Sequence, residues 1–282
     1  MRILVLGANG MFAKELLRSL KSGDFSIYGS SRGQKELLDN DCCKLVDNVN
    51  VLNLESVKNA IEKINPDCVI NLVGITKYKE SSMEDFIQVN SLAPHQIARI
   101  CEKKSIRFIQ ISTDCVFKGD KGNYIDEDKP NAIDLYGKTK GLGEINYLKN
   151  SLTIRTSFIG HNKFSKDGLL EWFLDQKDFC KGYSTALYSG LTTIELSKVF
   201  KNHILNNPSL HGIYNVSGPK LSKYDLLKKI SKIYKKEIEI SESSDWKIDR
   251  SLNSKKFEKA TGYHPPTWDS MIEEMYLANK ER

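Results

Sequence analysis

The sequence has no cysteine pattern that would hold a metal ion or form a redox pair. Its six cysteines include the adjacent Cys42 and Cys43, but no two of them have the C-x-x-C spacing, which is typical of zinc sites and dithiol redox centres. Cys68 and Cys101 lie in apolar segments and are expected to be small core residues. The sequence therefore indicates neither a metal site nor a redox dithiol.

Long apolar runs are also missing. The chain starts at Met1 with a short apolar segment that lacks the length of a secretory signal. No apolar run along the chain is long enough to span a bilayer. We therefore expect no membrane partner and a cytoplasmic location.

A strong charge imbalance is missing as well. The 282 residues contain 42 Lys and Arg and 36 Asp and Glu, a formal net charge of +6. Basic residues such as Lys228 and Lys229 lie among apolar residues at helical spacing, which is typical of a solvated helix face rather than of a nucleic-acid groove. We expect no nucleic-acid partner, although a basic surface helps to attract an anionic nucleotide.

What the first half of the sequence does have is a regular alternation of short apolar runs and amphipathic segments. This pattern predicts an α/β fold, a Rossmann-like doubly wound parallel sheet with helices on both faces. Strands are predicted at 3–6, 25–28, 44–46, 67–73, 106–112 and 152–155. Helices are predicted at 11–20, 53–64, 83–103 and 136–148.

After Gly160 the pattern is less regular and richer in aromatic and polar residues. Helices are predicted at 192–205, at 223–234 after a Ser222 cap, around 253–260 and from Thr267 onward, and a strand at 212–216 is predicted to rejoin the sheet. We therefore predict an NAD(P)-binding Rossmann domain at 1–160, to which 190–216 returns. A smaller mixed α/β substrate-binding lobe is predicted at 161–189 and 217–282.

A glycine-containing segment joins the first predicted strand to the first predicted helix. Glycines at such a turn let the backbone approach a pyrophosphate, which then lies on the amides of the helix N-terminus. The spacing G-x-x-G-x-x-A differs from the dinucleotide fingerprint, and tight turns use glycine in any case. Its position after the first strand favours a cofactor site made of Gly7, Asn9, Gly10, Met11 and Phe12.

The end of the second predicted strand indicates which dinucleotide is bound. An NAD site usually places an acid there to accept hydrogen bonds from the ribose, whereas this chain has Ser30, Ser31 and Arg32, with no acid before Glu36. Hydroxyls and a guanidinium suit a 2′-phosphate. NADPH is therefore the expected cofactor, with Ser31 and Arg32 beside it. NADH stays an open alternative, as does a plain surface role for Arg32.

Tyr136 and Lys140 are four residues apart in a predicted helix, so their side chains share one face. An ammonium beside the phenol is expected to lower the tyrosine pKa from about 10. Tyr136 can then donate a proton to a carbonyl, or remove one from an alcohol. Thr113, at the end of the fifth predicted strand, would hold the same oxygen. The predicted catalytic residues are therefore Thr113, Tyr136 and Lys140.

Several segments together resemble the extended short-chain dehydrogenase/reductases, in particular the dTDP-4-dehydrorhamnose reductase type. They are Gly7-Ala-Asn-Gly10, Asn71-Leu-Val-Gly74, Val89-Asn90, Ile111-Ser-Thr-Asp-Cys-Val-Phe117, Tyr136-Gly-Lys-Thr-Lys140, Arg155-Thr-Ser157 and Asp249-Arg-Ser-Leu-Asn253. The resemblance implies NADPH-dependent reduction of the 4-keto group of a nucleotide-activated 6-deoxy sugar, for deoxysugar or surface polysaccharide biosynthesis.

The same resemblance assigns further residues. It implies that Asn50 and Val51 border the adenine, that Ser157 lies near the nicotinamide, and that Tyr136 and Lys140 also touch the cofactor. It implies a structural or proton-relay role for Asn90. The segment implied to line the cofactor cleft is Leu72, Val73 and Gly74.

Cys115 departs from the resemblance, because this reductase type commonly has a tyrosine there. A 4,6-dehydratase would need a glutamate at this position to move a proton, and an unperturbed thiol does not do that work. Two alternatives stay open: a sugar-nucleotide epimerase that retains NAD, and a non-catalytic, cofactor-binding regulatory subunit. The thiol is expected to pack beside Val116 and Phe117 rather than to react.

The substrate, a nucleotide sugar, is expected to meet Thr113 and Cys115 on the sheet side and several residues of the C-terminal lobe. Arg250 is the preferred diphosphate partner, with Lys163 and Lys166 as further candidates. Rings that stack on a base or pack against the sugar are Phe158, Trp172 and Tyr183. Core packing is an equal alternative for Trp172. A homodimer is an open alternative for the assembly.

Overall fold

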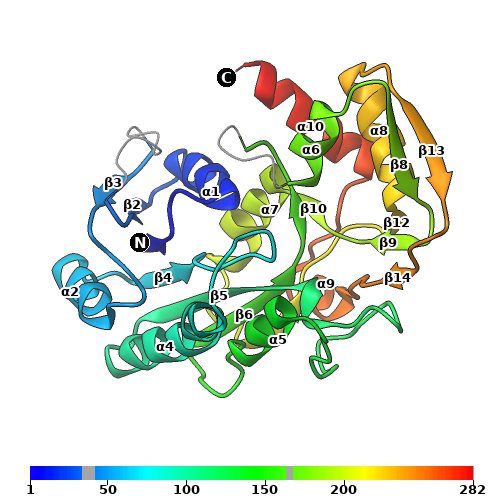
Figure 1. The fold of residues 1–282 in the computed structure, drawn as a ribbon. Coiled ribbons are helices and arrows are strands. Elements are labelled where there is room, and N and C mark those ends of the chain that lie inside the picture. The colour runs from blue at the N-terminus through cyan, green and yellow to red at the C-terminus, as the bar shows by residue number, and fades with distance from the viewer. Residues whose placement is uncertain (34–41, 163–167, 282) are drawn as a thin grey trace.

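A computed structural model of the chain describes residues 1–33, 42–162 and 168–281. Its centre is a seven-stranded sheet in which every neighbouring pair is parallel (Figure 1). In chain order the strands are β1 (Arg2–Leu6), β2 (Ser26–Ser30), β3 (Lys44–Val46), β4 (Cys68–Asn71), β5 (Arg107–Thr113), β6 (Ser151–Thr156) and β11 (Gly212–Asn215). Their spatial order is β11-β6-β5-β4-β1-β2-β3, so the direction of winding reverses between β1 and β4. Ligands of such sheets bind outside the carboxyl ends of the strands at this reversal.

Helices cover both faces of the sheet, which explains why residues 3–6 of β1 are all apolar. In β1, Ile3 and Val5 belong to the apolar core on one face, and Leu4 and Leu6 belong to the core on the other face. The first face is covered by α1 (Met11–Lys21) and α7 (Thr193–Val199), and the second by α2 (Leu54–Ile64) and α4 (Ala93–Lys103) (Figure 1). The predicted doubly wound parallel sheet is confirmed.

The long helix predicted at 83–103 is present, with a wider turn in its middle. It consists of α3 (Met83–Phe86), a π-helical segment (Ile87–Leu92) and α4. Such π segments inside helices occur frequently at functional sites. Here the segment carries Asn90, whose side chain contacts the loop after β4.

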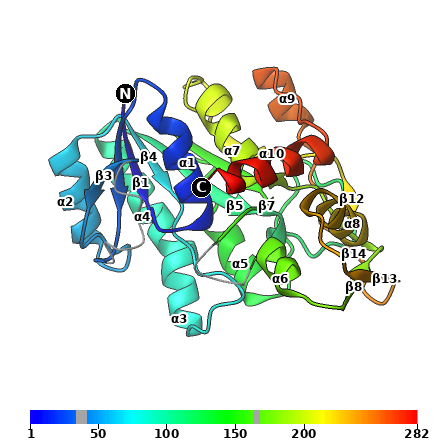
Figure 2. The same cartoon turned by 90° about the horizontal axis from the view of Figure 1, so that it is seen from above.

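The rest of the chain forms small sheets and helices at the opposite end of the molecule from β3 (Figures 1 and 2). Its strands are β7 (Phe158–Ile159), β8 (Phe179–Tyr183), β9 (Ala186–Tyr188), β10 (Leu191–Thr192), β12 (Leu221–Ser222), β13 (Glu239–Ser243) and β14 (Ile248–Asp249). Its helices are α6 (Leu169–Asp175), α8 (Lys223–Tyr234), α9 (Lys255–Thr261) and α10 (Trp268–Lys280). β8 pairs with β13, and β9 lies between β12 and β14. The proposed domain boundaries stay a prediction.

Several local predictions are confirmed in detail, and one helix end is wrong. The Ser222 side chain accepts a hydrogen bond from the Asp225 amide at the start of α8, and β11 rejoins the sheet beside β6. The helix predicted at 136–148, however, is α5 (Leu135–Leu142) and ends six residues earlier than predicted. The reason is Gly143, where a Cβ would collide with the Asn90 carbonyl. This close approach turns the chain away from the helix axis.

None of the helices within the described ranges combines the length and the apolar character that crossing a membrane needs.

Candidate active site

The parallel sheet gathers the predicted site residues at one edge. Because all seven strands run in the same direction, their carboxyl ends lie at the same edge of the sheet. The residues predicted from the sequence follow five of these ends or start the next helix: Gly7, Asn9, Gly10, Met11 and Phe12 after β1, Ser31 and Arg32 after β2, Asn50 and Val51 after β3, Leu72, Val73 and Gly74 after β4, and Ser157 after β6. Thr113 ends β5 and Cys115 follows it.

Thr113, one of the predicted catalytic residues, is held by its own neighbours. Thr113 Oγ1 donates to Asp114 Oδ1 at 3.1 Å and accepts from the Cys115 amide at 3.1 Å. α5 begins beside this segment, with the Asp134 side chain accepting from the Gly137 amide at 2.8 Å. A Cβ at Gly137 would collide with the Cys115 carbonyl. Glycine therefore lets α5 pack directly on the end of β5, which places Tyr136 beside Thr113.

The expected lowering of the Tyr136 pKa is wrong for the chain without ligand. Burial raises this pKa, with Cys115 adding to the increase, while a hydrogen bond with the Thr113 side chain acts in the opposite direction. The expected ammonium is turned elsewhere, since Lys140 Nζ donates to the Ile111 carbonyl at 2.6 Å. Tyr136 therefore keeps its proton at neutral pH, which suits a proton donor.

Lys140 lies at the base of the same site. Burial lowers its pKa to about 8, and the Glu144 carboxylate acts in the opposite direction. A Cβ at Gly74 would lie 3.8 Å from Lys140 Nζ and 3.4 Å from Asn90 Oδ1. The segment after β4 and the last turn of α5 therefore meet beside the ammonium, where the resemblance implies that Lys140 touches the cofactor.

Asn90 has a structural role in this arrangement. Its Oδ1 accepts from the Ile75 amide at 2.8 Å, and its Nδ2 donates to the Ile75 carbonyl at 2.9 Å. The same Nδ2 lies 3.4 Å from Thr139 Oγ1. Both ends of the amide therefore hold the segment after Gly74 against α5. Of the two predicted roles, this geometry supports the structural one.

A buried ion pair between Arg155 and Glu144 connects the segments that carry the candidate site. Arg155 Nε and Nη2 donate to the two carboxylate oxygens of Glu144 at 2.8 and 2.7 Å, and Ser112 Oγ donates to the same carboxylate at 2.7 Å. Arg155 Nη1 also reaches the Asp126 and Asp128 carbonyls, both at 3.1 Å. A bidentate pair of this kind fixes geometry as well as charge. It joins the end of α5, β6 and the loop after β5.

The turn after β1 fits a dinucleotide pyrophosphate. Gly7 has a φ of 82°, which favours glycine, and a Cβ there would lie 2.9 Å from Val73 Cγ2. The residue before α1 is Gly10, and in this described segment neither a side-chain cap nor a first-turn acid occupies the helix N-terminus. Its amides are therefore available to an anion. The Phe12 ring is buried against Phe158, with ring centroids 5.4 Å apart, so residue 12 faces a cofactor only through its backbone.

The end of β2 has an acidic neighbour that does not follow it in the chain. Ser31 Oγ donates to Asp47 Oδ1 at 3.1 Å, because β3 pairs with β2 and brings Asp47 alongside. Arg32 is exposed next to this pair, and Glu36 lies outside the described residues. The residues that follow β2 in the sequence give no sign of Asp47, because Asp47 follows β3 instead.

The substrate end combines a thiol with several cations. Arg250 Nη1 donates to Cys115 Sγ at 3.3 Å, and Arg250 Nη2 lies 3.5 Å from Asp134 Oδ2. Burial raises the Cys115 pKa to about 11, so the thiol keeps its proton, as expected for a packing role. Lys77 and Lys223 also interact electrostatically with Cys115. The sequence carries no signal for these two lysines, because Lys77 follows β4 and Lys223 begins α8, far apart in the chain. Lys163 and Lys166 lie outside the described residues.

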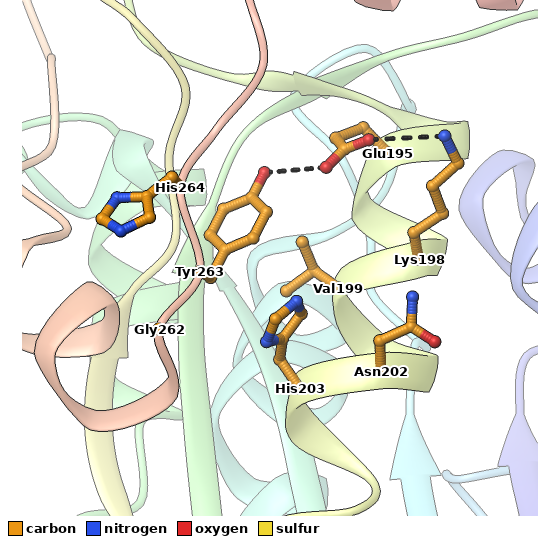
Figure 3. A pocket seen from close by; sticks show the side chains of 8 residues that line it. All are labelled: Glu195, Lys198, Val199, Asn202, His203, Gly262, Tyr263 and His264. Atoms are coloured by element: carbon orange, nitrogen blue, oxygen red, sulfur yellow. Dashed lines mark hydrogen bonds and ion pairs between the residues drawn. The ribbon is translucent and has the colours of Figure 1, made fainter.

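A separate open cavity of about 370 Å³ lies between α7 and the turn after α9 (Figure 3). It is lined by none of the predicted site residues. Tyr263 donates to Glu195 Oε1 at 3.0 Å, and Lys198 Nζ lies 3.7 Å from Glu195 Oε2 (Figure 3). Both carboxylate oxygens of Glu195 therefore have partners, Tyr263 and Lys198. The carboxyl ends of the strands remain the candidate active site.

Comparison with known proteins gives several matches. The chain is 32% identical over 165 residues to the probable low-salt glycan biosynthesis reductase Agl14 of Haloferax volcanii, a match that covers 56% of this chain and 54% of the relative. It is 26% identical over 156 residues to the methionine adenosyltransferase 2 subunit beta of Danio rerio, covering 53% of this chain and 44% of the relative. The chain thus spans about half the length of these relatives.

Solved structures share the whole fold. A dTDP-4-dehydrorhamnose reductase from Bacillus anthracis, in complex with NADP, superposes with a TM-score of 0.81 at 22% identity and covers 98% of this chain and 99% of its own. The sequence profile of the RmlD substrate binding domain matches residues 1–174, more than half of the 282 residues. The chain therefore belongs to the RmlD substrate-binding domain family.

Proposed function

We propose that the chain uses NADPH to reduce the 4-keto group of a nucleotide-activated 6-deoxy sugar. The observation that carries this proposal is the hydrogen bond between Tyr136 and Thr113 at the carboxyl end of β5, with Lys140 on the same helix as Tyr136 and beside Gly74 after β4. The family membership and the reductase names of the Haloferax and Bacillus proteins support it. The NADP in the Bacillus structure supports the choice of cofactor.

A bound NADPH would supply the hydride for the carbonyl carbon. The chain's own residues handle the oxygen and the proton. With substrate bound, the Thr113 hydroxyl would turn its proton from Asp114 Oδ1 to the carbonyl oxygen, and Tyr136, which burial keeps protonated, gives its phenolic proton to that oxygen. Lys140 Nζ, which donates to the Ile111 carbonyl in the chain without ligand, would turn toward the resulting phenolate and stabilise it. Because the pKa of Lys140 is about 8, this lysine carries its charge at neutral pH.

The reaction is tested by following loss of NADPH absorbance with 4-keto-6-deoxy sugars linked to dTDP, UDP and GDP. We expect oxidation of one NADPH per sugar reduced, and loss of this activity in Tyr136→Phe. Sugar interconversion without net NADPH oxidation would instead establish the epimerase. NADPH binding without turnover of any sugar would favour the non-catalytic subunit; the relative from Danio rerio is named as a subunit, the beta subunit of methionine adenosyltransferase 2. A non-catalytic subunit would have no physical need for Thr113, Tyr136 and Lys140 together.

We also propose that the chain forms a homodimer through the outer surface of α3, the π segment and α5. These elements pack beside one another, and they expose the apolar side chains Met83, Ile87, Leu92 and Leu142. The same surface of a second copy of the chain would bury these side chains. Light scattering should give twice the mass of the chain, and Leu142→Glu should give the monomer. A monomeric wild-type chain at micromolar concentration would contradict the dimer. The cytoplasmic location stays a prediction.

A further inference from the structure

A row of side chains leads from the catalytic centre to an exposed tryptophan. At its inner end Arg250 donates to Cys115 Sγ, two residues from Thr113. Lys223, the first residue of α8, interacts electrostatically with Cys115, Asp114 and Arg250. At the outer end, Lys223 Nζ lies 5.3 Å from the centre of the Trp246 ring. One lysine therefore connects the reacting centre with an aromatic surface of the C-terminal lobe.

Trp246 is exposed and held in place. It is 41% exposed, and its ring meets Tyr183 edge to face, with centroids 5.4 Å apart and an angle of 86° between the planes. Its carbonyl accepts from Thr185 Oγ1 at 2.9 Å, which fixes the loop that carries it. A ring already ordered in this way loses little conformational freedom when a planar base stacks on it.

The middle of the row carries more positive than negative charge. Lys77 and Arg250 each interact electrostatically with Lys223 and with Cys115. The carboxylates that face them are the buried Asp114 and, beside Arg250, Asp134 at 3.5 Å. Three cations therefore face two carboxylates here, and burial, with Lys77 adding to it, lowers the pKa of Lys223. A diphosphate would supply the missing negative charge and accept charge-assisted hydrogen bonds.

We propose that the nucleoside base of the substrate stacks on Trp246, with its diphosphate between Lys223, Lys77 and Arg250. From its inner to its outer end, the row places the catalytic hydroxyls, then the cations, then the aromatic ring. A nucleotide sugar has its sugar, its diphosphate and its base in the same spatial order. This inference rests on the proposed reductase function. It assigns the base to Trp246 instead of Trp172 on α6 or Phe158, which packs against Phe12.

Calorimetric titration of the full chain with dTDP, UDP, GDP and inorganic pyrophosphate separates the base from the phosphates. Trp246→Leu should weaken binding of the preferred nucleoside diphosphate by roughly 5- to 150-fold, the worth of one stacked base, and leave pyrophosphate binding unchanged. Trp246→Phe should restore most of the affinity. Phe179→Leu, which removes another exposed ring from β8, is the matched control and should bind like wild type.

Lys223→Met should weaken nucleoside diphosphates and pyrophosphate alike, by about tenfold or more, because both lose a charged hydrogen bond. Lys223→Arg should recover part of the affinity. The proposal is wrong if Trp246→Leu binds nucleotides like wild type, if it weakens pyrophosphate equally, or if Trp172→Leu shows the loss instead. These titrations need no turnover. Nucleotide binding that depends on Trp246 without reduction of any sugar would refute the reductase and leave the base site standing.

Discussion

The edge of the parallel sheet and the C-terminal lobe contribute to the site in different ways. On the sheet side, Thr113, Tyr136 and Lys140 come from one strand and the helix that follows it, and their positions depend on close local packing at Gly137. On the lobe side, Arg250 reaches Cys115 from 135 residues away in the chain. The predicted catalytic residues are therefore positioned by local packing, whereas the predicted substrate-binding residues come together from segments far apart in the chain.

The two regions also hold their charges differently. The Glu144–Arg155 pair under the catalytic edge is buried, with side-chain exposures of 4% and 1%. In the lobe, ion pairs such as Lys181–Asp245 lie at the surface. Substitutions at the edge should therefore affect chemistry and stability strongly, and substitutions of charges in the lobe should affect mainly binding.

The largest effect expected at the edge is that of Tyr136→Phe. Removing the proton donor should lower kcat by about 10²- to 10⁴-fold, with little change in KM, because the ring and its packing remain. Steady-state kinetics with NADPH and the preferred sugar nucleotide measures this. Tyr147→Phe, at an exposed tyrosine outside the site, is the control and should keep full activity. A Tyr136→Phe enzyme as fast as wild type would remove this residue from the mechanism.

The next largest effect concerns the buried ion pair. Arg155→Met should lower the free energy of unfolding by about 3–5 kcal/mol, because it leaves the Glu144 carboxylate buried without its partner. Lys181→Met removes the exposed pair in the lobe and should leave the stability unchanged within error. Urea denaturation of the two variants gives the comparison directly. Equal stability of both variants would show that the two regions do not differ in this respect.

The pH dependence of stability should reveal Lys140. Its pKa in the folded chain is about 8, below the ordinary 10.5, so between these two pH values the unfolded chain binds more protons. The free energy of unfolding of wild type should therefore rise with pH across this window relative to Lys140→Met, by on the order of 1–3 kcal/mol. Denaturation curves at pH 7.5 and 10 measure the difference. The same pH dependence of stability in both proteins would mean that folding does not lower the pKa of Lys140.

The smallest of these effects is expected at the end of β2. Arg32→Asp should reduce the preference for NADPH over NADH by about tenfold, the worth of one charged hydrogen bond. The ratio of kcat/KM for the two cofactors measures it, with Arg99→Asp on the surface of α4 as the control. An unchanged ratio would mean that Arg32 is a plain surface residue. Asp47, which accepts a hydrogen bond from Ser31, would then be the next residue to substitute.

Much of the fold could be predicted from the sequence because its signals are local, and the same local signals place the candidate site residues at the strand ends; their catalytic roles stay a prediction. The strand Lys44–Val46 and the helix Lys223–Tyr234 have the predicted bounds, since apolar spacing and a serine cap act over a few residues. The early end of α5 could not be predicted, because it depends on contact between Gly143 and Asn90.

Other misses have the same physical origin. The Tyr136 pKa depends on how deeply the phenol is buried and on where Lys140 points. Asp47 becomes a neighbour of Ser31 only through the pairing of β2 with β3. Lys77 and Lys223 meet only in the folded chain. Each of these depends on three-dimensional packing, which spacing along a single sequence does not encode.

The central claim is that this site transfers a hydride from NADPH to the 4-keto carbon while Tyr136 protonates the oxygen. Its most direct test uses NADPH that carries deuterium at the transferred position, a 4-keto-6-deoxy nucleotide sugar and the purified chain, with the product analysed by NMR. We expect deuterium at C4 of the product made by the wild-type chain, and formation of the same labelled product by Tyr136→Phe at a rate about 10²- to 10⁴-fold lower. A reduced sugar without deuterium at C4, or product formation by Tyr136→Phe as fast as by wild type, would contradict the claim.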